Sequence, residues 1–129
     1  MKTRGKILWV DDEIEHLKPH ILFLEEKGFE IETASNGADG IKLTKNRNID
    51  LALLDQYMPG MDGMDTLREL KKIDSALPVI MVTRSEEESL MNEAISEKVT
   101  QFLIKPVNPS QVFMAIKQVL ESGQIREEK

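Results

Sequence analysis

The sequence predicts an α/β domain in which helices cover both faces of a five-stranded parallel sheet. Short, continuous apolar runs are typical of strands that are buried on both faces. The chain has three of them, Ile7–Val10, Leu51–Leu54 and Pro78–Val82. Stretches with helical spacing of apolar residues separate these runs, and the connections are short. This alternation indicates parallel strands that are joined by helical crossovers.

The first predicted strand, Ile7–Val10, leads into a helix. Apolar residues recur three or four positions apart from Ile14 to Leu24, which is one face of a helix. Pro19 removes one backbone hydrogen bond inside this helix, so we expect a kink or an irregular first turn. We expect the helix to end at Gly28.

The middle of the chain repeats the pattern. Segment 30–34 alternates and predicts an edge strand, and Asn36-Gly37 predicts a turn or cap before a short helix. The second apolar run, 51–54, is followed by turn residues at 59–63 and by a helix over 64–70.

The last part of the chain completes five strand–helix units. The apolar run 78–82 ends at Thr83, and Ser85–Glu88 predicts a capping box that opens the next helix. A strand over 102–104 precedes Asn108-Pro109, which caps the last helix. Because crossovers are right-handed, five such strands favour the doubly wound, flavodoxin-like order 2-1-3-4-5.

The composition excludes several classes of protein. The 129 residues carry a net charge of −6 and no basic stripe, which argues against nucleic-acid binding by this segment. With no cysteine, the chain has no disulfide, thiolate zinc site or thiol nucleophile. The apolar run at 7–10 is too short for a membrane span or a signal peptide, so we expect a cytoplasmic protein with no membrane contact. We expect one domain over 1–121 and a polar tail, or the start of a linker to a missing effector domain, over 122–129.

Polar side chains lie at the carboxyl ends of four predicted strands. They are Asp11 and Asp12, Asp55, Thr83 and Lys105. Ligands bind at this edge of doubly wound sheets, so we expect three carboxylates, a hydroxyl and an ammonium to meet there. Three close carboxylates repel one another unless a cation lies among them, and oxygen-only ligands suit Mg²⁺. A carboxylate beside Mg²⁺ can attack a phosphoryl group, whose oxygens the lysine and threonine then bind.

Four motifs in order resemble those of response-regulator receiver domains, over Lys6 to about Leu120. Each motif alone is weak, but four at the ends of predicted strands are specific. They are Val10-Asp11-Asp12-Glu13, the segment Leu54–Gly63, Val82-Thr83 and Ile104-Lys105-Pro106. The resemblance implies a phosphoprotein of two-component or phosphorelay signal transduction, which catalyses only its own phosphorylation and dephosphorylation.

The resemblance also implies a role for each site residue. Asp55 would be the phosphoacceptor, taking the phosphoryl group from a sensor histidine kinase or a phosphotransfer protein. Asp12 would bind Mg²⁺ directly and Asp11 through water. Asp55 and the backbone carbonyl of Tyr57 would complete the metal site.

Switching would depend on the remaining motif residues. Thr83 and Lys105 would bind the phosphoryl oxygens, and the Lys105–Pro106 peptide bond would be cis. Phe102 lies at the position of the family's switch aromatic, which turns inward when Thr83 moves. Output would pass through the face formed by the helix after Ser85, the strand 102–104 and the last helix. An output domain or protein would bind there, and whether phosphorylation also produces a homodimer is left open.

Two positions depart from the family's common pattern. Arg84 replaces a residue that is usually small, and Tyr57 is bulky for its position. Our hypothesis is that these gating residues restrict access of water, so that self-dephosphorylation is slow.

A narrower resemblance is to the PorX-type regulators of Bacteroidetes, which are linked to type IX secretion. Segments Leu17–Leu24 and Phe102–Pro109 carry it. In that group a middle helical segment and an alkaline-phosphatase-like domain follow the receiver. The resemblance therefore implies that this chain is a fragment.

Several residues also have purely structural interpretations. Asp12 could be a helix N-cap, Phe102 a core residue and Arg84 an ordinary surface residue. His16 and His20, four apart on one helix, could pair on a metal, but without a third ligand we expect a solvated face.

Two other functions compete with a phosphoacceptor. One is a pseudo-receiver that binds partners independently of phosphorylation, although the expected site residues are all retained. The other is a phosphatase with an aspartate nucleophile. Gln56 and Tyr57 follow Asp55, so the second carboxylate that such hydrolases use is missing.

Overall fold

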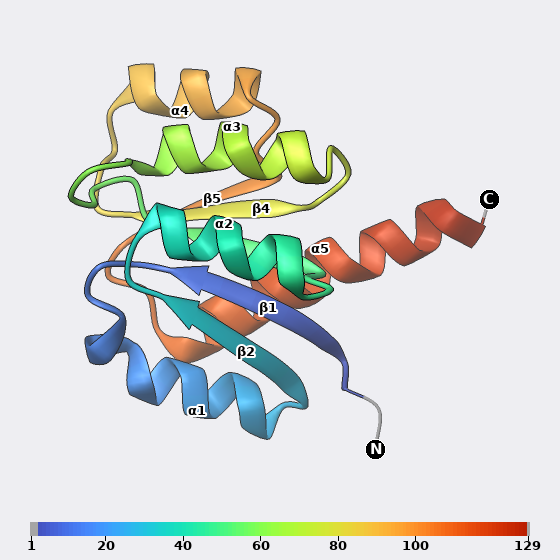
Figure 1. Ribbon diagram of the computed structural model, residues 1–129. Helices are drawn as coiled ribbons and strands as arrows, with labels where there is room; N and C mark the ends of the chain where they lie inside the picture. The colour runs from blue at the N-terminus through green and yellow to red at the C-terminus, as the bar shows by residue number, and fades with distance from the viewer. Residues whose placement is uncertain (1–2, 129) are drawn as a thin grey trace.

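The computed structural model describes the backbone of residues 3–128 and the side chains of residues 3–122 (Figure 1). Residues 1–2 and 129 lie outside the description. Five parallel strands form one sheet in the order β2-β1-β3-β4-β5, which confirms the predicted fold. The strands are β1 Gly5–Val10, β2 Phe29–Ala34, β3 Leu51–Leu54, β4 Val79–Thr83 and β5 Gln101–Ile104. The α-helices are α1 Lys18–Glu26, α2 Gly37–Asn46, α3 Gly63–Ile73, α4 Glu88–Ser96 and α5 Pro109–Glu128, and a 3₁₀ turn covers Ile14–Leu17.

Helices cover both faces of the sheet. Helices α1 and α5 pack on one face, and α2, α3 and α4 pack on the other (Figure 1). Strand β1 contributes alternately to the two cores: Ile7 and Trp9 face α1 and α5, while Leu8 and Val10 face the other three helices. All four side chains are fully buried, as a strand between two helical layers requires.

The strand register brings the predicted site residues to one edge. Val10 pairs with Leu54, so the residues that follow them, Asp11 and Asp55, are neighbours across two adjacent strands. Thr83 pairs with Ile104, which places Lys105 at the same edge.

Most helix starts agree with the sequence. The turn at Ile14–Leu17 precedes α1, and Pro19 lies in the first turn of α1, which confirms the predicted irregular start. Asn36 caps α2 by accepting a hydrogen bond from the backbone N–H of Asp39. Asn108 caps α5 by accepting one from the N–H of Gln111.

The capping box predicted at Ser85–Glu88 is wrong. The hydroxyl of Ser85 accepts a hydrogen bond from the N–H of Glu87, 3.2 Å away, and α4 begins only at Glu88. A local turn of this kind satisfies the serine before the helix starts, which a capping pattern in sequence cannot exclude.

The backbone of α5 remains helical through Glu128, across most of the segment predicted as a tail. Whether that segment leads to an effector domain stays a prediction. Within residues 3–128, no helix is both long enough and apolar enough to cross a bilayer.

We predict that Gly63→Ala destabilises the protein, because α3 approaches the end of β3 too closely for a side chain. A Cβ atom at Gly63 would lie 2.4 Å from the carbonyl oxygen of Asp55. The expected loss in free energy of unfolding is about 1–3 kcal/mol by urea denaturation.

The control is Gly60→Asn, at a position with φ of +80° and open space around it. A side chain at this φ adds backbone strain but meets no atom, and asparagine visits the left-handed region more readily than most residues, so its loss should be smaller than that of Gly63→Ala, at about 1 kcal/mol or less. Equal stability of the Gly63→Ala variant and the wild type would contradict the packing argument.

Candidate functional site

Three carboxylates meet at the carboxyl edge of the sheet. One oxygen from each of Asp11, Asp12 and Asp55 lies within 4.8 Å of the others. Asp11 is fully buried, Asp55 is 5% exposed and Asp12 is exposed to solvent. The strand register therefore brings together the carboxylates that the sequence predicted.

Lys105 supplies the positive charge at this edge. Its Nζ donates hydrogen bonds to Asp11 Oδ2 at 2.7 Å and to Asp55 Oδ2 at 3.2 Å. Burial lowers the pKa of Lys105, but its hydrogen bonds to Asp11 and Asp55 and their negative charges outweigh this, so the pKa is raised overall. The lysine stays charged at neutral pH, bound between two of the three carboxylates.

Two polar atoms at the site have no partner within the described residues. Asp55 Oδ1 and Thr83 Oγ1 are both buried, and neither has a hydrogen-bond partner. Asp11, in contrast, uses both of its oxygens, since Oδ1 accepts from the N–H of Glu13 at 2.8 Å. A buried polar atom without a partner is unfavourable, so the site has unused bonding capacity beside Asp55 and Thr83.

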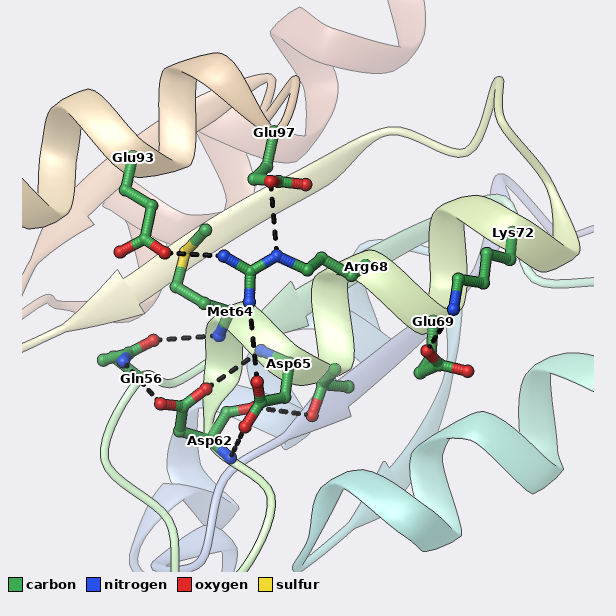
Figure 2. Close-up of polar contacts among 10 residues, drawn as sticks. Gln56, Asp62, Met64, Asp65, Arg68, Glu69, Lys72, Glu93 and Glu97 are labelled. Carbon is green, nitrogen blue, oxygen red and sulfur yellow. Dashed lines mark hydrogen bonds and ion pairs between the residues drawn. The ribbon is translucent and has the colours of Figure 1, made fainter.

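The segment after Asp55 is held to α3 by Gln56, a role that the sequence did not predict (Figure 2). Gln56 Oε1 accepts from the N–H of Met64 at 2.9 Å, and its Nε2 donates to Asp62 Oδ2 at 3.2 Å. Asp62 and Asp65 form a reciprocal capping box at the start of α3. The Asp-x-x-Asp spacing after the loop was the available signal for this start.

Arg68 ties α3 to α4 (Figure 2). Its guanidinium lies 2.6 Å from Glu93 on α4, 3.2 Å from Glu97, which caps the end of α4, and 3.5 Å from Asp65. The sequence alone does not predict this network, because segments that are distant in sequence supply the charges.

The two gating candidates differ in their surroundings. Arg84 is paired with Glu13, and both line a cavity of about 510 Å³ that also includes Lys105. Tyr57 is 52% exposed. Arg84 is thus held beside the site, while Tyr57 faces solvent.

The remaining predicted residues lie on β5 or immediately after it. Phe102 is half-buried and packs against the core on the α2, α3 and α4 side of the sheet. The Lys105–Pro106 peptide bond is cis.

The solvated face predicted for both histidines is wrong for one of them. His16 is exposed, but His20 is half-buried. The His20 ring bonds to the backbone of Val107 and packs against Trp9, because α1 lies over β1 and the β5–α5 connection.

Comparison with known proteins gives the class. Residues 7–117 match the model of the response regulator receiver domain. The chain is 34% identical over 115 residues to the transcriptional regulatory protein ResD of Bacillus subtilis, which covers 89% of this chain and 48% of ResD. It is also 34% identical over 117 residues to GlrR of Escherichia coli, covering 91% of this chain and 26% of GlrR. The chain thus spans about half or less of these relatives.

Solved structures agree with the fold. A receiver domain protein from Methanospirillum hungatei superposes with a TM-score of 0.90 at 29% identity, covering 95% of this chain and 98% of that one. The CheY of Borrelia burgdorferi, solved with CheX, BeF₃ and Mg²⁺, has a TM-score of 0.85 at 29% identity, covering 92% and 90%.

The chain belongs to the response regulator receiver domain family of two-component systems. Domains of this family bind Mg²⁺ through acidic residues and interact with histidine kinases and output domains. The donor set of this chain fits such an ion, since three carboxylates with oxygens within reach of one another face a single ammonium.

We predict that Lys105→Met lowers the free energy of unfolding by about 2 kcal/mol at pH 8 in the presence of a chelator, because two buried carboxylates lose their counter-charge. A raised pKa in the folded state means that the stabilisation is complete below the ordinary lysine pKa of about 10.4. The gap between wild type and variant should therefore close as pH rises through the raised pKa of Lys105.

Urea unfolding from pH 8 to pH 11 measures this gap. The control is Lys45→Met at an exposed position of α2, where little change is expected at any pH. A gap for Lys105→Met that is absent, or constant with pH, would contradict the assignment.

Proposed function

We propose that this chain is a phosphoacceptor whose Asp55 takes a phosphoryl group from a histidine kinase or phosphotransfer protein. The observation that carries the proposal is a pair of buried atoms, Asp55 Oδ1 and Thr83 Oγ1, that have no hydrogen-bond partner among the described residues, while the other oxygen of Asp55 accepts from the Lys105 ammonium. One atom can accept and the other can donate, so both would gain partners when a metal and a phosphoryl group enter. Membership of the receiver family supports the same function.

In the proposed reaction an Asp55 carboxylate oxygen forms a bond to phosphorus, and the phosphorus–nitrogen bond of the donor breaks. The histidine nitrogen leaves with that electron pair. Lys105 and the hydroxyl of Thr83 then donate hydrogen bonds to the phosphoryl oxygens. Lys105 already lies 3.2 Å from Asp55, so its move is small.

The carboxylates of Asp11, Asp12 and Asp55 and the backbone carbonyl of Tyr57 would hold Mg²⁺, with Asp11 acting through water. Mg²⁺ would supply charge that offsets repulsion between the carboxylates and the incoming phosphoryl oxygens. The exposed Asp12 gives the ion an approach from solvent.

Thr83 and Phe102 would carry the switch. When Thr83 moves to bind the phosphoryl group, Phe102 would turn further into the core on the α4 side, where it is now only half-buried. The face formed by α4, β5 and α5 would then change its affinity for an output domain or protein.

We also propose a location and a domain context for this chain. We place the domain in the cytoplasm, at residues 1–121, with 122–129 leading toward an effector domain of a PorX-type regulator. Homodimer formation on phosphorylation is a further outcome to be tested.

We expect the chain to gain a phosphoryl-sized mass when it is incubated with Mg²⁺ and acetyl phosphate. Intact mass spectrometry measures the gain. Asp55→Asn should abolish it, because the amide oxygen is not a nucleophile for phosphorus, and a chelator should abolish it as well.

The matched control is Asp50→Asn, a carboxylate that lies far from the site and accepts from the N–H of Lys6. This variant should label like the wild type. If the folded wild type fails to label with Mg²⁺ bound, either Arg84 and Tyr57 close the site to small donors or the chain is a pseudo-receiver. A beryllofluoride titration separates the two, and failure to bind beryllofluoride as well would overturn the phosphoacceptor function.

We expect Arg84→Ala and Tyr57→Asn to speed hydrolysis of the aspartyl phosphate severalfold, because each removes a bulky side chain that restricts water. The decay of the phosphorylated mass after donor removal gives the rate. Unchanged decay in both variants would contradict the gating role.

A further inference from the structure

His20 joins three parts of the fold beside the proposed site. It lies on α1, and its Nε2 is 2.7 Å from the carbonyl oxygen of Val107 in the β5–α5 connection. Its ring packs edge-on against Trp9 of β1, with centroids 6.1 Å apart and an interplanar angle of 83°. Trp9 lies two residues before Asp11, and Val107 lies two residues after Lys105.

The contact with Val107 determines which nitrogen of the His20 imidazole carries the hydrogen. A carbonyl oxygen can only accept, so Nε2 carries the hydrogen and donates it. Nδ1 is buried and has no partner in the described part of the chain. The ring therefore makes one directional bond, and its edge-on packing against Trp9 fixes the direction in which that bond points.

The hydrogen bond between His20 and Val107 restrains the backbone segment that carries Lys105. On one side, the backbone N–H of Lys105 donates to the carbonyl oxygen of Thr83 at 2.8 Å. On the other side, Val107 is held by His20 across 87 residues of sequence. The backbone of Lys105 is thus fixed from both directions, and its Nζ reaches both Asp11 and Asp55.

We propose that His20 is a positioning residue, whose bond to Val107 holds the β5–α5 connection so that Lys105 reaches Asp55. The inference rests on the proposed function, since Lys105 acts there on the phosphoryl group. If His20 were only a packing residue of α1, its loss would lower stability and leave the rate of phosphorylation unchanged.

The test compares His20→Leu, which removes the donor, with His20→Gln, whose amide N–H can replace Nε2–H. The rate of Asp55 phosphorylation is measured against acetyl phosphate concentration at saturating Mg²⁺. We expect His20→Leu to lower the maximal rate about tenfold, as small misplacements of a reacting group do. The Mg²⁺ concentration for half-maximal labelling should not change, because the carboxylates are untouched.

His20→Gln should recover the rate to within about threefold of the wild type, because it restores one hydrogen bond. The control for stability is Ile21→Ala, a half-buried neighbour on α1 that packs into the same core. This variant should unfold more easily yet label at the wild-type rate.

Three results would overturn the inference while the wild type still labels. They are a normal rate for His20→Leu, equal slowing in His20→Leu and Ile21→Ala, and no recovery in a folded His20→Gln. A wild type that takes up no phosphoryl group on Asp55 and binds no beryllofluoride would instead overturn the proposed function, and this inference with it.

Discussion

The site depends on one electrostatic constraint, namely that two buried carboxylates at a sheet edge, Asp11 and Asp55, share a single ammonium beside the exposed carboxylate of Asp12. Lys105 bonds to Asp11 and Asp55, and both of these carboxylates are buried. Removing two carboxylates from water costs several kcal/mol each even after the protein relaxes, and one lysine offsets only part of this cost. The arrangement persists because the backbone register of β1 and β3 leaves Asp11 and Asp55 no other place.

A series of side-chain contacts links Asp55 to α4 through the β3–α3 connection. Gln56, next to Asp55, holds the first turn of α3, and Arg68 on α3 holds α4 through Glu93 and Glu97 (Figure 2). A continuous set of contacts therefore runs from the phosphoacceptor candidate to a helix of the proposed output face. Coupling between Asp55 and α4 along this route would pass through the bonds of Gln56 and Arg68.

The sequence was sufficient for the sheet and for the five polar residues at its edge. Short continuous apolar runs predict strands that are buried on both faces. A carboxylate or lysine directly after such a run therefore lies at the end of the strand. The features that it did not predict arise between distant segments. The start of α4 depends on a local bond from the N–H of Glu87 to the hydroxyl of Ser85, and the burial of His20 depends on where α1 lies over β1 and the β5–α5 connection. Arg68 finds its partners only once α3 and α4 are side by side.

Asp55 Oδ1 and Thr83 Oγ1 are buried and have no hydrogen-bond partner among the described residues, which indicates how the site would change when a ligand binds. Among the described residues neither atom has a partner that offsets the cost of its burial, so a ligand that bonds to both would make a different arrangement of the site more favourable. A ligand that binds the folded state alone stabilises it in proportion to its affinity and concentration. An ion and a phosphoryl group that satisfy these atoms would therefore stabilise a rearranged site, and the movement needed to reach Thr83 is what would carry the signal to β5 and α4.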